Sequence, residues 1–102
     1  AYHEALALDP RLAWAHEGLG RALARKGDYG AAAQSFARAL ELHPDRISAL
    51  RLLALAREKE GRIEESLRLW SEVAARTQDP VYRDEAQGRI RNLHGTPGSP
   101  RP

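Results

Sequence analysis

The residues that most often act as catalysts or metal ligands are scattered through this sequence. The four histidines stand far apart, without a histidine partner one helical turn away and without a paired carboxylate: His3, His16, His43 and His94. Glu64 and Glu65 are adjacent, so on a helix their carboxylates point in different directions. We expect them to face the helix dipole rather than to form an acid-base pair. The sequence predicts neither a metal site nor an acid-base site.

One glycine-rich stretch has the wrong context for binding a nucleotide. "GLGRAL" runs from Gly18 to Leu23 and contains the first two glycines of a phosphate-binding fingerprint. No strand pattern precedes it and the third glycine is missing, so we reject a nucleotide site. No serine stands with a histidine and an acid in a recognisable catalytic arrangement. We therefore expect that the chain is not an enzyme and uses no cofactor.

A third group of residues has the chemistry of binding rather than of catalysis. Buried aromatic and arginine contacts often carry much of the binding free energy of protein interfaces. Here such side chains, with one leucine and one lysine, recur at helical spacing: Trp14, Arg21, Arg25, Arg51, Leu55, Lys59, Tyr82 and Arg89. The offset from Arg21 to Leu55 is the same as the offset from Arg25 to Lys59. The elements that position this group must therefore be helices that repeat with the same period.

A 34-residue repeat is visible elsewhere in the sequence. "ALALDP" at 5–10 is followed by "ALELHP" at 39–44, and the same offset places Phe36 on Trp70. Alanine, leucine, arginine and glutamate dominate while β-branched residues are scarce, which favours helix throughout. Small residues align with small residues and aromatic with aromatic, so each period predicts one helical unit.

Each unit is predicted to be a helical hairpin with a glycine at its turn. Gly27 and Gly61 fit the end of a helix, where a left-handed conformation costs glycine nothing. Asp28 can cap the helix that follows, so "KGDYG" reads as the hinge between two antiparallel helices. Gly20 and Ala32 are expected to leave room for these helices to approach closely.

At these positions the sequence resembles the tetratricopeptide repeat family. The family pattern appears as "HEGLGRAL", "AAQSF", Ala39 and Pro44, and the second unit departs from it at Ala54 and by a later proline, Pro80. The resemblance implies an all-α fold, a right-handed superhelical stack of antiparallel helix pairs. The chain then divides into five segments. Residues 1–10 are expected to be the second helix of a truncated repeat, 11–44 a full repeat and 45–78 a degenerate repeat. Residues 79–94 are expected to form a C-terminal capping helix that starts at Asp79-Pro80, and 95–102 a disordered tail.

The resemblance also implies a concave groove, lined by the first helix of each pair, that receives a peptide or helix of a partner. The eight binding candidates would line it, with Trp14 and Tyr82 as aromatic anchors at its ends. Two alternatives stay open. Glu17, Arg51 and Glu85 share one column and can pair with one another, which would leave Arg51 unavailable to a ligand. Trp14 can instead cover the seam with the truncated first repeat.

The residues on the groove face argue against one class of ligand, C-terminal carboxylates. Where the family binds C-terminal carboxylates it uses a clamp of lysine and asparagine, and this chain offers Glu17, Leu52 and Ala86 where donors would be needed. That ligand class is disfavoured.

Composition narrows the partners further. The 102-residue chain has a net charge of +2, which slightly favours an acidic partner. Its basic residues alternate with Glu17, Glu58 and Glu85, which argues against nucleic acid, and no apolar run is long enough for a membrane span. Without cysteine the compartment stays open, with a soluble protein in the cytoplasm favoured. Richness in alanine and arginine favours a bacterial source.

The leading functional hypothesis is a non-catalytic scaffold that binds a protein or peptide. A chain that starts inside a helix pattern without methionine reads as part of something longer. This leaves two alternatives, an assembly domain that self-associates through its truncated N-terminal edge and an accessory arm that recruits a substrate to an enzyme domain.

Overall fold

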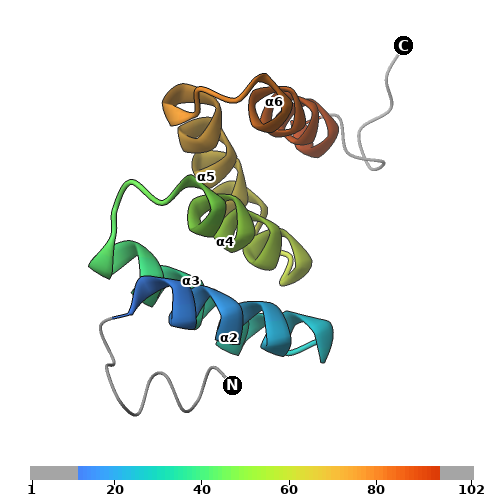
Figure 1. The fold of residues 1–102 in the computed structure, drawn as a ribbon. Helices are drawn as coiled ribbons and strands as arrows, with labels where there is room; N and C mark the ends of the chain where they lie inside the picture. The colour runs from blue at the N-terminus through green and yellow to red at the C-terminus, as the bar shows by residue number, and fades with distance from the viewer. Residues whose placement is uncertain (1–11, 95–102) are drawn as a thin grey trace.

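Five helices follow one another along residues 12–94, the part of the chain that the computed structural model describes (Figure 1). They are α2 (Ala13–Arg25), α3 (Tyr29–Leu42), α4 (Ile47–Lys59), α5 (Ile63–Arg76) and α6 (Pro80–His94). No strand occurs in this range, which confirms the all-α class. The helix expected within 1–10 and the tail expected at 95–102 lie outside the described residues.

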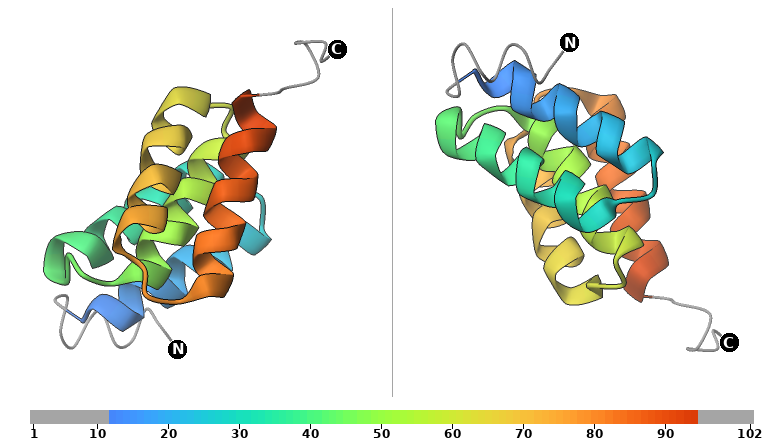
Figure 2. Two further views of the ribbon diagram at one scale, coloured as in Figure 1. Left: turned by 90° about the horizontal axis from the view of Figure 1, so that it is seen from above. Right: turned by 90° about the horizontal axis from the view of Figure 1, so that it is seen from below.

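The repeat period of the sequence sets the positions of the helices. Ala13 and Ile47, which begin α2 and α4, are one period apart, and so are Tyr29 and Ile63, which begin α3 and α5. Each helix packs on the next: α2 on α3, α3 on α4, α4 on α5 and α5 on α6. The two views of Figure 2 show this succession of neighbouring helices from opposite sides. The fold is therefore a helical solenoid built from antiparallel pairs.

The hinge between α2 and α3 depends on a left-handed glycine. Gly27 has φ +87° and Gly61, its counterpart before α5, has φ +84°. The Gly27 N–H donates to the Ala24 carbonyl at 2.9 Å and the Asp28 N–H to the Leu23 carbonyl at 3.0 Å. These two hydrogen bonds cap the C-terminus of α2. The Asp28 carboxylate then accepts from the Ala31 N–H at 3.3 Å and caps the N-terminus of α3. Both the turn and the cap were predicted from the sequence, and the structure shows them.

Replacing Gly27 with valine is expected to lower the free energy of unfolding by more than about 1 kcal/mol, because a β-branched residue is strained at positive φ. A Cβ at this position would meet no atom within 4 Å, so the loss comes from the backbone alone. Gly27→Asn is the matched control, since asparagine tolerates the left-handed region better and should lose less. Urea unfolding of the two variants measures the difference, and equal losses would contradict the backbone explanation.

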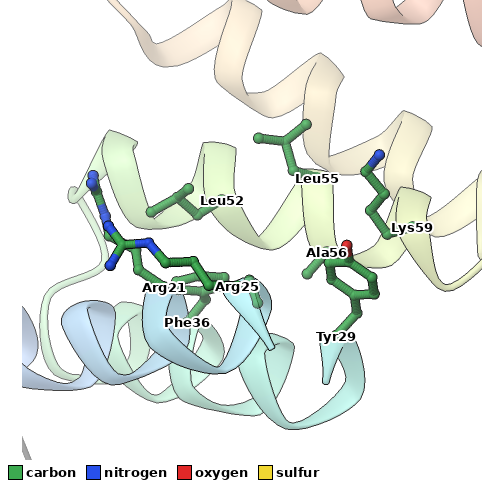
Figure 3. A pocket seen from close by; sticks show the side chains of 9 residues that line it. Arg21, Arg25, Tyr29, Phe36, Leu52, Leu55, Ala56 and Lys59 are labelled. Carbon is green, nitrogen blue, oxygen red and sulfur yellow. The ribbon is translucent and has the colours of Figure 1, made fainter. Parts of the chain in front are cut away.

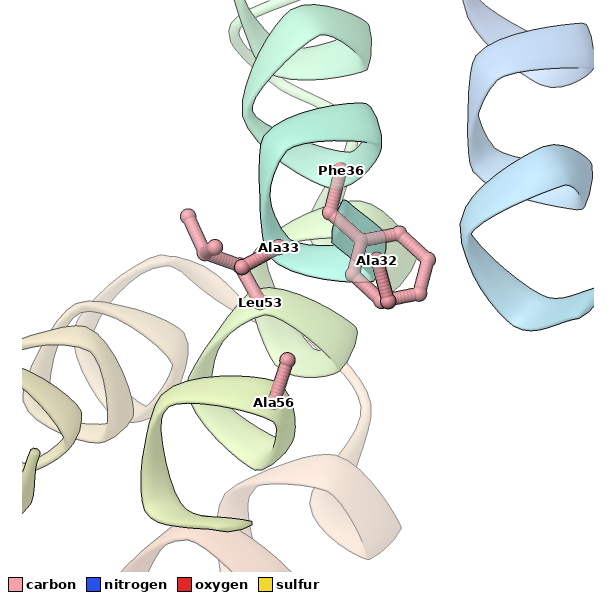
Figure 4. Close-up of a cluster of buried hydrophobic side chains, with 5 residues drawn as sticks. All are labelled: Ala32, Ala33, Phe36, Leu53 and Ala56. Atoms are coloured by element: carbon pink, nitrogen blue, oxygen red, sulfur yellow. The ribbon is translucent and has the colours of Figure 1, made fainter. Parts of the chain in front are cut away.

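Two clusters of buried apolar side chains hold the helices together. The first cluster joins α3 to α4 and contains Ala32, Ala33, Phe36, Leu53 and Ala56 (Figure 4). The second cluster joins α4, α5 and α6 and contains Leu50, Ala54, Trp70, Val73 and Ala86. Because half of these residues are alanines, neighbouring helices approach closely around one aromatic ring in each cluster.

Gly20 makes room for that ring in the first repeat. A Cβ on Gly20 would lie 2.5 Å from Cε1 of Phe36, closer than any real contact. The sequence predicted a close approach of two backbones at Gly20 and Ala32. The structure refines this prediction, since at Gly20 the space is taken by the Phe36 ring, which reaches from α3 toward α2 in Figure 4.

The last helix, α6, begins where the sequence predicted. The Asp79 carboxylate accepts from the Val81 N–H at 2.9 Å, and Pro80 occupies the first turn. Ala86 is buried against the second cluster, whereas Asp84 and Gln87 are exposed on the outer side. The role of α6 as a cap on the solenoid stays a prediction. Among the described helices, none has the length and apolarity needed to cross a membrane.

Candidate functional site

A cavity of about 300 Å³ opens between the second halves of α2 and α4, above the start of α3 (Figure 3). We call it the α2–α4 cavity. Its walls come from three helices: Arg21, Ala24 and Arg25 of α2, Tyr29 and Phe36 of α3, and Leu52, Leu55, Ala56 and Lys59 of α4. Most of the lining is apolar, and the charged groups stand around it rather than inside it. Such a surface suits a side chain that is apolar at its tip and flanked by polar groups.

Four of the eight binding candidates meet in this cavity. Arg21 and Arg25 come from α2, and Leu55 and Lys59 occupy the equivalent positions of α4, one repeat period later. The columns set by the repeat therefore bring together residues of α2 and α4, the first helices of two successive pairs. Whether these residues bind a ligand stays a prediction.

Sequence reasoning missed part of the same cavity. Tyr29 was read only as a hinge residue, yet its ring forms one wall of the cavity (Figure 3). Ala56 was missed too, although it follows Leu55 directly on α4. Leu52 had been placed on this face, but only as a position that lacks a clamp donor. Two signals could have found the missed residues. Ala56 is the neighbour of the predicted residue Leu55 on α4, and Tyr29 lies just across the short hinge from Arg25.

The cations around the cavity have few acidic partners in the part of the chain that the structure describes. In the described range 12–94, no carboxylate pairs with Arg25 or Lys59. Of the described acidic residues, Arg21 approaches only Glu17, with 3.5 Å between Nη2 and Oε2, and half of its side chain is exposed. The Glu17 carboxylate already accepts from Ser48 at 3.0 Å and from Arg46, so Arg21 is its most distant partner. Among residues 12–94, Arg25 and Lys59 thus have no acidic partner, and Arg21 has only this long contact.

Arg51, by contrast, is engaged with Glu85 on the neighbouring helix. Its Nη2 donates to Glu85 Oε2 at 3.0 Å and its Nε donates to Oε1, a two-point contact between α4 and α6. The hydrogen bond with Glu85 raises the pKa of the Arg51 guanidinium, against the opposing effect of burial. Because this pKa is raised, the contribution to stability is complete at neutral pH and is lost only in strongly alkaline solution.

The two alternatives left open in the sequence have different outcomes. Arg51 and Glu85 do pair, but Glu17, the third member of their column, pairs with Arg46 and Ser48 instead. Arg51 also lies over the Tyr82 ring, 5.7 Å from its centroid, and Tyr82 packs on the second cluster. Trp14 is 50% exposed at the start of α2 and does not line the cavity. The seam that Trp14 was expected to cover lies outside the described residues.

Arg89, the last of the eight candidates, is also held by the chain itself. Its Nη1 donates to Glu58 Oε2 at 3.0 Å, and its guanidinium lies 5.9 Å from the centre of the Trp70 ring. The other oxygen of Glu58 accepts from Trp70 Nε1 at 3.3 Å. Arg51, Tyr82 and Arg89 thus link α6 to α4 and α5, and the structure does not bring them into the α2–α4 cavity.

Of the adjacent glutamates Glu64 and Glu65, the second forms ion pairs with arginines. Glu65 is bonded to Arg57 at 3.1 Å and to Arg62 at 3.3 Å, near the start of α5. Within residues 12–94, no three histidine or acidic side chains gather in a way that could hold a metal ion.

Comparison with known proteins decides the family. The model of a family described as tetratricopeptide repeat matches the chain over residues 1–47 and again over 18–82. The chain belongs to the tetratricopeptide repeat family. The two overlapping matches cover the described helices from α2 through α5 and reach into α6. Among curated proteins, none gives a significant match to the chain. Tetratricopeptide repeats generally mediate interactions between proteins, which places this chain in a class of interaction modules.

In this tetratricopeptide chain, the ion pair between Arg51 of α4 and Glu85 of α6 is expected to contribute measurably to the free energy of unfolding. In a double-mutant cycle with Arg51→Ala and Glu85→Ala, we expect a coupling energy of about 1 kcal/mol, because the pair is two-point and only about a quarter exposed. Arg38→Ala and Glu41→Ala on α3 form the control cycle, since that pair is more than half exposed and should couple more weakly. Urea unfolding measures both cycles, and equal coupling would tell against a structural role for Arg51.

Proposed function

We propose that this tetratricopeptide chain binds a segment of another protein, with acidic and apolar residues, in the α2–α4 cavity and performs no catalysis itself. The observation that carries the proposal is the meeting of an apolar cavity with cations that, among residues 12–94, have no acidic partner (Arg25 and Lys59) or only a 3.5 Å contact to one (Arg21). Arg21 and Arg25 face Leu55 and Lys59 across it, one pair from each of two successive repeats.

The position of the cavity supports the same function. Its lining residues come chiefly from α2 and α4, which are the first helices of two successive pairs. This is the face that the family resemblance assigns to the ligand. Phe36 at its base belongs to the first cluster, so the cavity stands on a packed core and needs little rearrangement to receive a side chain.

Selection of a random-peptide display library on the immobilised chain tests this proposal. Peptides enriched on the wild type should bind much less to Tyr29→Ala, Leu55→Ala, a double variant that removes two apolar walls of the cavity. The control is Val81→Ala, which trims an exposed apolar side chain on α6. Circular dichroism confirms that both variants keep their helical content. Peptides that bind the double variant as well as the wild type, or the absence of any enrichment, would contradict the proposal.

Trp14→Ala serves as a separate arm of the selection. Trp14 is exposed but lies outside the cavity, and its proposed role is an additional anchor at the start of α2. A loss of peptide binding with Trp14→Ala would extend the binding surface toward the N-terminal end of the groove. Unchanged binding would limit it to the α2–α4 cavity.

A further inference from the structure

The cations of the inner face divide into two groups with different uses. Arg51 and Arg89 are held by Glu85 and Glu58, and both lie over aromatic rings. Arg25 and Lys59 have no acidic partner among residues 12–94, and Arg21 has only the long contact to Glu17. Among the inner-face cations of residues 12–94, those without a close acidic partner are therefore the ones that line the cavity.

The three cations of the cavity stand on two sides of it. Figure 3 shows the guanidinium groups of Arg21 and Arg25 on one side and the ammonium group of Lys59 on the other. Leu52 and Leu55 lie between them along α4, with Phe36 below. A segment that crosses from α2 to α4 thus meets positive charge, then an apolar hollow, then positive charge again.

The size of the hollow limits what can enter. About 300 Å³ lies at the lower end of the range for ligand pockets, which suits a single large apolar side chain rather than a folded surface. A carboxylate placed inside would be buried against apolar walls, at a cost that the exposed cations outside could not offset well. The carboxylates of a ligand therefore belong at the rim, on either side of the apolar group.

We infer, in an extension that rests on the proposed function, that the partner segment presents one large apolar side chain with an acidic residue on each side of it in the partner's sequence. The apolar side chain occupies the cavity against Leu55 and Phe36. One carboxylate contacts Arg21 and Arg25, and the other contacts Lys59. Arg21 can turn from Glu17 to the ligand without leaving that carboxylate unpaired, because Arg46 and Ser48 remain bonded to it.

A charge reversal tests this arrangement with the same random-peptide library as probe. Arg25→Glu, Lys59→Glu reverses one exposed cation on each side of the cavity and leaves the apolar walls intact. The matched control, Arg68→Glu, Arg91→Glu, makes the same change in net charge at exposed positions of α5 and α6 outside the cavity. Thermal unfolding by circular dichroism verifies that both double variants fold.

Wild type and control are expected to enrich peptides in which aspartate or glutamate flanks a large apolar residue on both sides. The cavity variant should instead enrich lysine or arginine at those flanks. A synthetic copy of the most enriched wild-type peptide should lose about tenfold in affinity when its two flanking acids are replaced by amides, since each exposed pair contributes modestly. The loss should shrink at high salt.

The outcomes separate this inference from the proposed function. Peptides that depend on Tyr29 and Leu55 but show no acidic flanks, or acidic residues on one side only, would overturn the inference and leave the proposed function standing. Peptides that ignore the cavity altogether would overturn both. A concentration-dependent mass in sedimentation, abolished by the cavity variant, would show that a second copy of this chain occupies the cavity, and would also overturn the inference.

Discussion

Replacing Trp70 with alanine is expected to lower the free energy of unfolding by about 3 to 5 kcal/mol, the cost typical of removing a fully buried aromatic side chain. Trp70 has no exposed surface and is the largest of the fully buried side chains. It packs with Leu50 of α4, Val73 of α5 and Ala86 of α6, so its loss leaves a hole where three helices meet. Small domains have only about 5 to 15 kcal/mol in total, so the variant should be barely stable.

Trp14→Ala is the natural control for this experiment, because half of the Trp14 side chain is already exposed. Its effect on stability should be far smaller, since exposed substitutions seldom cost more than about 0.5 kcal/mol. Urea unfolding followed by circular dichroism reports both values. If the two variants unfolded at the same urea concentration, the assignment of Trp70 as the residue that joins α4, α5 and α6 would be wrong.

The second large effect is expected at Gly20. Replacing Gly20 with alanine should lower the free energy of unfolding by about 1 to 3 kcal/mol, the usual cost of overpacking, because the new Cβ would lie 2.5 Å from the Phe36 ring. This loss outweighs the gain of about 1 kcal/mol that alanine brings over glycine inside a helix. The ring has no room to yield, since Phe36 is buried in the first cluster.

Two further variants make the Gly20 result specific. Gly88→Ala on α6 is the matched control, because its new Cβ would meet only Arg91 Nη2 at 3.9 Å, and it should gain stability from helix propensity. Gly20→Ala combined with Phe36→Leu should lose less than the sum of the single losses, since the smaller side chain relieves the clash. Additive losses would contradict the assigned contact between α2 and α3.

The repeat and its hinges could be predicted because their causes are local. A left-handed φ at Gly27 and Gly61 follows from glycine's lack of a side chain, and the cap at Asp28 needs only the three residues that follow it. The repeat period then indicates where the equivalent helices of successive pairs begin. These features need no knowledge of how one repeat is rotated on the next.

The ion pairs between helices could not be assigned in this way. The column that contains Glu17, Arg51 and Glu85 suggested one ladder, yet only Arg51 and Glu85 meet. Glu17 turns instead to Arg46, which precedes α4 and has a side chain long enough to reach back to α2. Which arginine pairs with a given glutamate depends on how the helices are placed relative to one another. The spacing of residues in the sequence does not determine that placement.

The same limit applies to the binding surface. Helical spacing grouped eight residues on one face, and the structure separates them into four that line the cavity, three that hold α6 in place, and Trp14 at the edge. Tyr29 joins the cavity only because the hinge folds α3 back against α2. The sequence therefore grouped these residues on one face, whereas the contacts were needed to separate those that hold α6 from those that line the cavity.

The most direct test of the central claim is to map a peptide onto the chain by NMR. The peptide most enriched from the library would be titrated into the isotope-labelled chain while backbone amide shifts are followed. Binding in the α2–α4 cavity predicts the largest shifts around Arg21, Arg25, Leu55 and Lys59, with α6 little changed. Shifts concentrated on α6 or on the outer side of α5, with the cavity residues unmoved, would contradict it.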